Sequence, residues 1–203
     1  MHTTPATYSD VDEAVQVLAA AFAEDPITGF LLAPGSGYPG RVARFFSILM
    51  RVRIALDMPV ILARESGRIN GAAMGYTTAR PKWPSDLAEE WSAFENSTAG
   101  MVARMAQYES IADKFAPSEP HYYLGVIGVD PKLRGRGIGN RLLTAFCSLS
   151  ADDPLSGGVY LETAQPSNIP FYRGAGFIEA GRENLGNGPL WCMLLRHANR
   201  NAV

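Results

Sequence analysis

The chain has 203 residues, of which 47% are hydrophobic and 19% are charged, and its formal net charge at pH 7 is −2. These values are ordinary for a globular protein, and the length is most simply that of a single domain, residues 1–203, with a substantial core. A near-neutral charge with scattered basic residues argues against nucleic acid or an anionic membrane as a bulk partner. We therefore expect neither of these partners.

A cytoplasmic location is expected from three features of the chain. No apolar run reaches the roughly 18–20 residues that a membrane-spanning helix needs. The N-terminal sequence MHTTPATYSD lacks the apolar centre of a signal peptide. Cys147 and Cys192 are the only cysteines, and we interpret both as small apolar core residues in a reducing compartment.

Helical periodicity dominates the first part of the chain, and a hairpin follows. Val11 and Leu18 share one helical face, and Asp25-Pro26 interrupts that pattern. Gly67 suits the turn of the hairpin. The expected elements are a short edge strand at residues 6–8, a helix of about 13 residues after a capping box at 9–12, a short helical turn at 27–32, a loop at 34–40, a helix at 41–56, and hairpin strands at 59–64 and 70–76.

Residues 85–115 form a mostly helical segment between the third and fourth expected strands. Gly100 and the polar run at residues 96–98 divide it into two helices. The last strand is expected at residues 190–195, and the tail from His197 onward is expected to fray.

The most informative stretch is residues 122–140, YYLGVIGVDPKLRGRGIGN. Its apolar, β-branched first half is typical of a buried strand, which Asp130-Pro131 ends. Glycines then alternate with other residues ahead of an apolar stripe of helical period. Glycines allow close backbone approach, and the first N–H groups of a helix lack partners. The stretch therefore predicts a site for phosphate oxygens, to which Arg134 and Arg136 add positive charge.

Two common phosphate-binding loops do not fit this stretch. The nucleotide-triphosphatase loop needs Gly-Lys-Ser/Thr, which is absent. The dinucleotide fingerprint needs its third glycine where Asn140 or Leu142 stands. A glycine-rich turn without any ligand stays open as the simpler interpretation.

A third phosphate-binding pattern does fit. Arg134-x-x-Gly137-x-Gly139 resembles the acyl-coenzyme A pyrophosphate loop of the GCN5-related N-acetyltransferases, the GNAT superfamily. A second signature of that family consists of a strand, an asparagine, Phe-Tyr and Gly-Phe. It is found here, in the same order, as residues 159–163, Asn168, Phe171-Tyr172 and Gly176-Phe177.

Further segments resemble the puromycin N-acetyltransferase branch of this family. They are residues 19–26, 119–120, 161–163, 168–172 and 188–193. Because they run from the first helix to the last strand, we interpret them as indicating architecture and not the antibiotic as substrate.

The resemblance implies an α/β (α+β) fold of the GNAT type. Its mixed sheet of six or seven strands would be splayed in a V between the fourth and fifth strands and flanked by helices. The acyl-coenzyme A-binding core would cover residues 122–180. The helices at residues 85–115 would border the acceptor site, or would merely cover one face of the sheet.

On the same resemblance, acetyl-coenzyme A (acetyl-CoA) is the acyl donor and no metal takes part. Where neighbouring strands part, their inward backbone groups are unpaired and must find a ligand or water. The end of the 122–129 strand would therefore bind the pantetheine arm, and an N–H near Val129 would polarise the thioester carbonyl. The residues expected to bind the cofactor are Ile127, Gly128, Val129, Arg134, Gly135, Arg136, Gly137, Ile138, Gly139, Asn140, Asn168 and Phe171.

Two residues are expected to carry the proton transfers of the reaction. Tyr172 is the candidate general acid toward the leaving thiolate, because a phenol of pKa near 10 can protonate a thiolate of pKa about 8.5 in an uphill but feasible step. Its alternative role is packing in the short helix. Glu162 is the candidate general base, directly or through water, or else the ion-pair partner of an arginine. Asn168 would bind the pantetheine arm or cap the short helix.

Other residues have weaker claims to a chemical role. His121 has a suitable ordinary pKa, but it stands at the beginning of its strand, which favours a surface histidine. Asp25, Trp83 and Trp91 are candidates for the acceptor pocket, or ordinary loop and core residues. Cys147 lies on an apolar helical face with no nearby base, which argues against a nucleophile.

The function indicated is acetyl transfer from acetyl-CoA to a primary amine of a small molecule, directly within a ternary complex. Two alternatives stay open: a protein N-terminal or lysine acetyltransferase, and a non-catalytic acyl-CoA-binding module. The sequence also leaves open the identity of the acceptor and the choice between monomer and homodimer.

Overall fold

The structure, a computed structural model, describes residues 1–197. Its strands are β1 (His2–Pro5), β2 (Val60–Glu65), β3 (Arg68–Tyr76), β4 (Tyr122–Val129), β5 (Gly158–Thr163), β6 (Ile178–Leu185) and β7 (Gly188–Arg196). Its α-helices are α1 (Val11–Ala21), α2 (Pro26–Leu32), α3 (Tyr38–Ala55), α4 (Ser85–Ser97), α5 (Met101–Phe115), α6 (Ile138–Asp152) and α7 (Ile169–Gly174). The tail that was expected to fray lies, beyond His197, outside the described residues.

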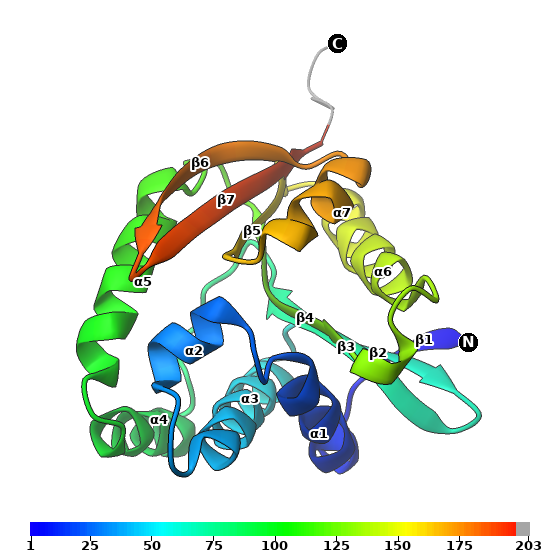
Figure 1. Cartoon of the computed structure of the whole chain (residues 1–203). Helices are drawn as coiled ribbons and strands as arrows, with labels where there is room; N and C mark the ends of the chain where they lie inside the picture. The colour runs from blue at the N-terminus through cyan, green and yellow to red at the C-terminus, as the bar shows by residue number, and fades with distance from the viewer. Residues whose placement is uncertain (198–203) are drawn as a thin grey trace.

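The seven strands form one mixed sheet in the order β1-β2-β3-β4-β5-β7-β6 (Figure 1). β4 and β5 are parallel, and the other neighbouring pairs are antiparallel. The parallel pairing joins Tyr122 to Val159 and Tyr123 to Tyr160, at the beginning of each strand, and does not continue along the described strands. The backbone groups of β4 that face β5 after these pairs are therefore without a strand partner. The expected mixed sheet, open between its fourth and fifth strands, is confirmed.

A β-bulge in β4 changes the direction of its side chains. Met74 of β3 pairs with Val126 and Gly75 pairs with Leu124, so Gly125 is an extra residue on β4. As a result, Leu124 packs into the core beneath α6, whereas Val126 packs into the core beneath α1 and α3. Bulges bend their strand and are frequent next to active sites. This bulge lies where β4 parts from β5.

Helices cover both faces of the sheet. α1 and α3 pack on one face of the β2–β4 half, and α6 packs on the opposite face (Figure 1). Side chains along β2 alternate between the two faces, as a strand requires: Leu62 belongs to the α1–α3 core, and Ile61 and Ala63 belong to the α6 core. α5 packs against β6 and β7 at the other end of the sheet.

The expected strand at residues 6–8 is wrong. β1 lies earlier in the chain and a 3-10 turn follows it, because Asp10 forms a capping box with Thr7. The Thr7 N–H donates to Asp10 Oδ2 at 2.9 Å, and Asp10 also forms an ion pair with Arg64 of β2. The expected capping box at residues 9–12 is wrong for the same reason.

Two later elements also differ from expectation. α3 begins at Tyr38, inside the expected loop, because Gly37 takes a left-handed conformation with φ +74° and Pro39 is tolerated in the first helical turn. β6 was not predicted. It is an edge strand whose side chains are mostly exposed, so it carries no hydrophobic alternation.

Three further properties of the described residues bear on partners. No single helix within residues 1–197 is long and apolar enough to cross a membrane. Tyr8–Ala21, which contains the 3-10 turn and α1, passes that test only together with α2, as a pair bent by 104°. Over the same residues, no group of three or more His, Cys, Asp or Glu is arranged to hold a metal ion. Both cysteines are free thiols, Cys192 in the core of β7 and Cys147 partly buried on α6.

Candidate active site

The turn between β4 and α6 presents unpaired backbone N–H groups. Gly135 and Gly137 have φ values of +79° and +76°, which residues with a side chain rarely adopt. Gly137 is the N-cap of α6, and no side chain caps this helix. The N–H groups of residues 138–140 therefore have no partner within the helix. With the positive end of the helix dipole, they form a site suited to phosphate oxygens.

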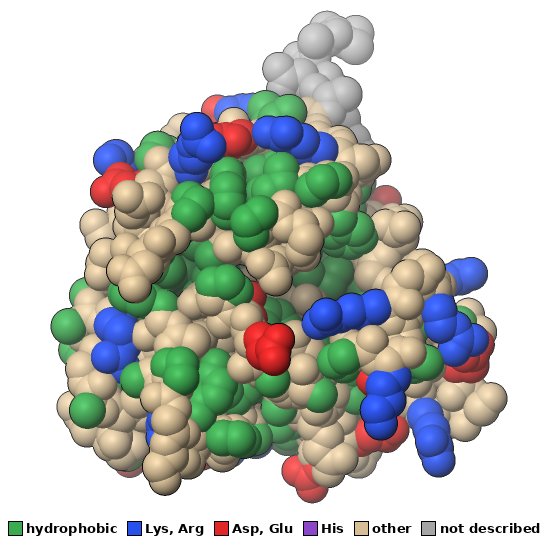
Figure 2. All heavy atoms as spheres, in the orientation of Figure 1, with side chains coloured by type: hydrophobic (Ala, Val, Ile, Leu, Met, Phe, Trp, Pro, Cys, Tyr) green, Lys and Arg blue, Asp and Glu red, His purple; other side chains and the backbone are tan. Residues whose placement is uncertain are grey.

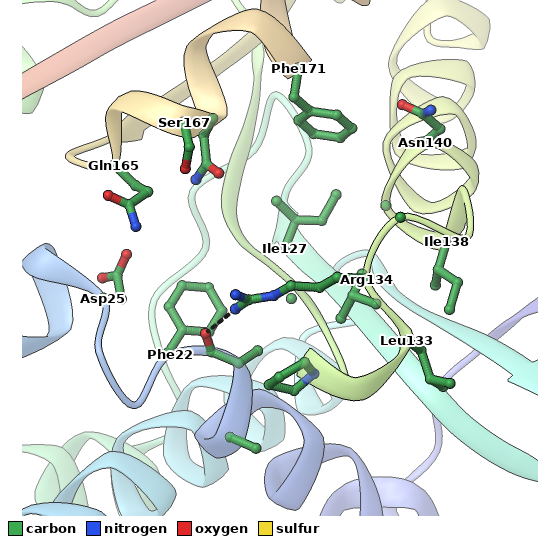
Figure 3. Close-up of a pocket in the computed structure, with 18 of the residues that line it drawn as sticks. Phe22, Asp25, Ile127, Leu133, Arg134, Ile138, Asn140, Gln165, Ser167 and Phe171 are labelled. Atoms are coloured by element: carbon green, nitrogen blue, oxygen red, sulfur yellow. Dashed lines mark hydrogen bonds between the residues drawn. The ribbon is translucent and has the colours of Figure 1, made fainter.

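A cleft of about 820 Å³ opens beside this turn (Figure 3). Its walls are the end of α1 with the loop after it, the end of β4 with the glycine turn, and residues 165–172. Every residue that the sequence predicted to bind the cofactor lines this cleft except Arg136. Arg136 points elsewhere, with its Nη2 4.0 Å from Glu65 Oε2.

Arg134 reaches across the cleft. Its Nη2 donates to the carbonyl oxygen of Ala21, the last residue of α1, at 3.3 Å (Figure 3). Asp25 and Gln165 point into the same space from two other walls. The guanidinium is exposed and remains able to bind a phosphate group that rests on the amides of α6.

The wall formed by α1 was not predicted as part of the cofactor site. It lies close to β4 because of Gly128, where a Cβ would be 2.8 Å from Leu18 Cδ2 and 2.9 Å from Phe22 Cε2. Asp25 fixes the loop after α1 by capping α2, and its Oδ1 accepts the Thr28 N–H at 2.8 Å. The signal in the sequence is an aspartate directly before a proline, which is typical of a helix start.

A second cavity, of about 740 Å³, adjoins the cleft. Five residues line both spaces, so the two meet where β4 and β5 part: Phe22, Asp25, Ile127, Asn168 and Tyr172. Figure 2 shows this face of the molecule hollowed, with apolar side chains inside the hollow. The aromatic residues of the second cavity are Phe22, Phe45, Phe46, Tyr76, Trp83, Trp91, Tyr108, Tyr123, Tyr160 and Tyr172. Because α4 and α5 supply Trp91 and Tyr108, the helices at residues 85–115 border this cavity.

Glu162 of β5 lies in the wall of the second cavity. Its Oε2 accepts hydrogen bonds from the hydroxyls of Tyr108 and Tyr123, each at 2.9 Å. Its Oε1 is buried and has no hydrogen-bond partner among the described residues. Burial raises the pKa of Glu162 to about 7, although the tyrosine hydrogen bonds act to lower it. The sequence left two roles open for Glu162, a general base facing the cleft between the strands or an ion-pair partner of an arginine. The structure places Glu162 in the cavity wall, and its hydrogen-bond partners are tyrosines instead of an arginine.

Tyr172 of α7 lies at the junction of the cleft and the second cavity and is 4% exposed. Burial raises its pKa well above the ordinary value, and the negative charges of Asp25 and Glu162 add to that effect. The phenol therefore holds its proton at neutral pH. Asn168 Nδ2 donates to Thr163 Oγ1 at 3.2 Å, and the Asn168 side chain does not cap α7.

The structure also places the weaker candidates. His121 is partly buried and lines the second cavity, with its ring 5.8 Å from that of Tyr160, and burial lowers its pKa. Trp83 and Trp91 line the same cavity and contact each other, with ring centroids 5.6 Å apart. Cys147 packs in the α6 core, where burial raises its pKa to about 12, as expected of an unreactive thiol.

Comparison with known families agrees with this architecture. The model of the acetyltransferase (GNAT) family matches residues 55–177, which is more than half of the chain and contains both signature segments. The chain therefore belongs to the GNAT acetyltransferase family, and it is an enzyme of the N-acetyltransferase type. The expectation drawn from Arg134-x-x-Gly137-x-Gly139 is confirmed at the level of the superfamily.

Solved structures with the same fold cover nearly the whole chain. A structure from Corynebacterium glutamicum, described as histone acetyltransferase HPA2 and related acetyltransferase, is 24% identical with a TM-score of 0.74, over 98% of this chain and 97% of the other. A polyamine N-acetyltransferase of Drosophila melanogaster is 16% identical with a TM-score of 0.65, over 97% and 99%. A GNAT family acetyltransferase of Brucella melitensis in complex with acetyl-CoA is 18% identical with a TM-score of 0.52, over 97% and 96%.

Proposed function

We propose that this enzyme transfers the acetyl group of acetyl-CoA to the primary amine of a small molecule, directly within a ternary complex. The observation that carries the proposal is the meeting of two cavities at the opening between β4 and β5. One is built for phosphate and an extended arm, and the other is aromatic with a carboxylate in its wall. Tyr172 stands between them.

The cleft residues fit an acyl-CoA. The free amides of residues 138–140 and the side chain of Arg134 suit a diphosphate. The unpaired edge of β4, residues 127–129, suits the amide groups of a pantetheine arm, which would pair with it as a strand partner would. An N–H of β4 near Val129 then polarises the thioester carbonyl, as an oxyanion-binding donor does.

The residues of the second cavity can move the protons that the reaction requires. A bond forms between the amine nitrogen and the acetyl carbon while the carbon–sulfur bond of the thioester breaks. Glu162 accepts the proton that the amine loses, directly or through water, and a pKa of about 7 suits that role near neutral pH. Tyr172 donates its proton to the departing thiolate sulfur. In this chemistry, acetyl-CoA supplies the thioester.

The organisation of the chain is part of the same proposal. Residues 1–203 act as one cytoplasmic N-acetyltransferase domain, monomeric or homodimeric, with the acyl-CoA core at residues 122–180 and the acceptor side at 85–115. Its segments resembling the puromycin N-acetyltransferase branch run from α1 to β7, and they support placement in that branch. The acetyl-CoA-bound relative from Brucella melitensis supports the choice of donor. The volume of the second cavity, about 740 Å³, and its aromatic lining are those of a small-molecule pocket, which supports a small molecule over a protein chain as acceptor.

Thiol release tests the proposal directly. The purified protein is given acetyl-CoA and a panel of small primary amines, and release of free CoA is followed alongside the acetylated product. We expect turnover with some of these amines and a raised melting temperature with CoA, because a ligand that binds the folded state stabilises it. Binding of CoA without turnover of any amine would favour the non-catalytic acyl-CoA-binding module.

A further inference from the structure

Arg53 of α3 is a buried cation in the wall of the second cavity. It is 4% exposed, and its Nη1 donates to the carbonyl oxygen of Leu49, one turn earlier in the same helix, at 2.9 Å. Its Nε is buried with no hydrogen-bond partner among the described residues. No carboxylate within residues 1–197 forms an ion pair with it, and a buried charge without a partner is costly.

A second cation shares the same aromatic ring. The Cζ atoms of Arg53 and Arg80 lie 4.7 Å and 5.6 Å from the centroid of the Tyr76 ring. Arg80 also lines the cavity, and its guanidinium donates to the carbonyl oxygens of Thr77, Ala79 and His121. Two guanidinium groups around one ring repel each other, and none of the ion pairs within the described chain neutralises either of them. An anion placed between them would relieve that repulsion.

Gly125, the extra residue of the β-bulge, leaves space for this buried cation because it has no side chain. A Cβ on Gly125 would lie 3.2 Å from Arg53 Nη2 and 3.0 Å from Tyr123 Cε1, closer than side chains normally pack. The Tyr123 hydroxyl in turn donates to Glu162 Oε2 at 2.9 Å. Tyr123 therefore lies between a basic region of the cavity, at Arg53 and Arg80, and an acidic one at Glu162.

We propose that the natural acceptor carries an anionic group, a carboxylate or a phosphate, as well as the amine that is acetylated. Arg53 and Arg80 bind the anion, while the amine lies at Glu162 and the aromatic walls hold the apolar spacer between them. The idea rests on the proposed N-acetyltransferase function and narrows its acceptor class. The exposed acids Glu109 and Asp113 of α5 also line this cavity. The competing acceptor class is therefore a diamine, which carries a second positive charge where the proposed acceptor carries its anion.

A matched series of acceptors tests this proposal. ω-Amino carboxylates of graded chain length are compared, at each length, with the alkylamine, the diamine and the amino-alkyl phosphate, in assays that measure kcat/KM with saturating acetyl-CoA. At the best chain length, we expect kcat/KM for an anionic acceptor to exceed that for the alkylamine and the diamine by about tenfold or more. This is the gain that one hydrogen bond to a charged group typically gives. Comparison of the amino carboxylates with the amino-alkyl phosphates shows which anion the enzyme prefers.

Two variants test whether the arginines cause the preference for an anionic acceptor. Arg53→Met and Arg80→Met each remove one guanidinium, and Arg80 is exposed, so its variant is expected to fold even if Arg53→Met does not. Both should lower kcat/KM for the anionic acceptor about tenfold while changing that for the alkylamine less than about twofold. Arg44→Met is the control, because Arg44 is exposed on the same helix and does not line the cavity.

The outcomes separate this proposal from the one on which it rests. Turnover of alkylamines or diamines as good as that of the anionic acceptors overturns the acceptor class and leaves the N-acetyltransferase function standing. Equal losses for all acceptors in Arg80→Met would show a structural role and would also overturn it. Absence of turnover with every amine overturns both proposals.

Discussion

The cleft, which is the proposed cofactor site, and the second cavity, which is the proposed acceptor cavity, adjoin each other but are built from different parts of the polypeptide. The cleft offers mainly backbone: the amides of α6, the unpaired edge of β4 and the left-handed glycines of the turn. The cavity offers side chains from α3, α4, α5, β4 and β5. A backbone site depends on a few glycines in one contiguous stretch, whereas a side-chain site draws single residues from distant segments. Substitutions should therefore act on donor binding in the first region and on chemistry or acceptor choice in the second.

The largest expected effect lies in the acceptor cavity, at Glu162. Glu162→Gln removes the proposed base and should lower kcat/KM for the amine by about 10²–10⁴-fold, the usual range for a general base. The dissociation constant of CoA should stay unchanged in calorimetry, because Glu162 does not line the cleft. Glu89→Gln, an exposed change on α4, is the control. Activity within a few-fold of the parent enzyme would show that the base is another group.

Tyr172→Phe tests the residue that stands between the two regions. Loss of the phenol proton donor should lower kcat about 10–100-fold, less than loss of the base, because a thiolate of pKa near 8.5 can also take a proton from water. KM for acetyl-CoA should change little. Tyr8→Phe, at an exposed tyrosine remote from both spaces, provides the comparison. Unchanged kcat would leave Tyr172 a packing residue.

Gly137→Val tests the backbone site. The left-handed φ of +76° is strained for a β-branched residue, although a Cβ there would meet no neighbour within 4 Å. The helix start should shift, and CoA affinity should fall about tenfold, with the relative rates of different amines unaltered. Gly174→Ala is a control without positive φ and with open space around it. An altered choice of amine in Gly137→Val would contradict the separation of the two regions.

The pH dependence of kcat/KM should report Glu162. The base must be deprotonated, so the rate should rise with pH through a midpoint near 7. Tyr123→Phe removes a hydrogen bond that stabilises the carboxylate, which raises the pKa of Glu162 further and moves the midpoint to higher pH. A downward shift, or a profile without this limb, would exclude Glu162 as the titrating group.

The smallest expected effect compares two arginines of the glycine turn. Arg134→Met should weaken CoA binding about fivefold at low salt, whereas Arg136→Met should change it less, because Arg134 lines the cleft and Arg136 points toward Glu65. Calorimetry at two salt concentrations measures both. A larger loss from Arg136→Met would mean that this side chain turns into the cleft when the donor binds.

The difference between the two regions also explains what could be predicted from the sequence. The strand, glycine turn and helix of residues 122–140 are contiguous, so the pattern predicted the local fold of this stretch. Of the residues that it assigned to the cofactor here, all but Arg136 line the cleft. The wall of the cleft formed by α1 was not predicted, because its contact with Gly128 joins segments far apart in the chain. β6 was not predicted, because an exposed edge strand needs no hydrophobic alternation.

The acceptor cavity was only partly predictable for the same physical reason. Glu162 was found through its place near the end of β5, but its partners Tyr108 and Tyr123 come from α5 and β4. Arg53 lies on a helix whose periodicity indicated only a core face, and the space for its guanidinium depends on the absence of a side chain at Gly125, on a distant strand. The place of His121 in the cavity wall could not be predicted, because its position in the strand does not reveal that the cavity extends to that end of β4.

Hydrogen–deuterium exchange with and without CoA is the most direct test of the central claim, that the donor binds backbone groups at the open edge of β4 and at the start of α6. We predict slower exchange of the amides at residues 127–129 and 138–140 when CoA is bound, with little change in α4 and α5. Unchanged exchange at both of these segments, at a CoA concentration that raises the melting temperature, would contradict it.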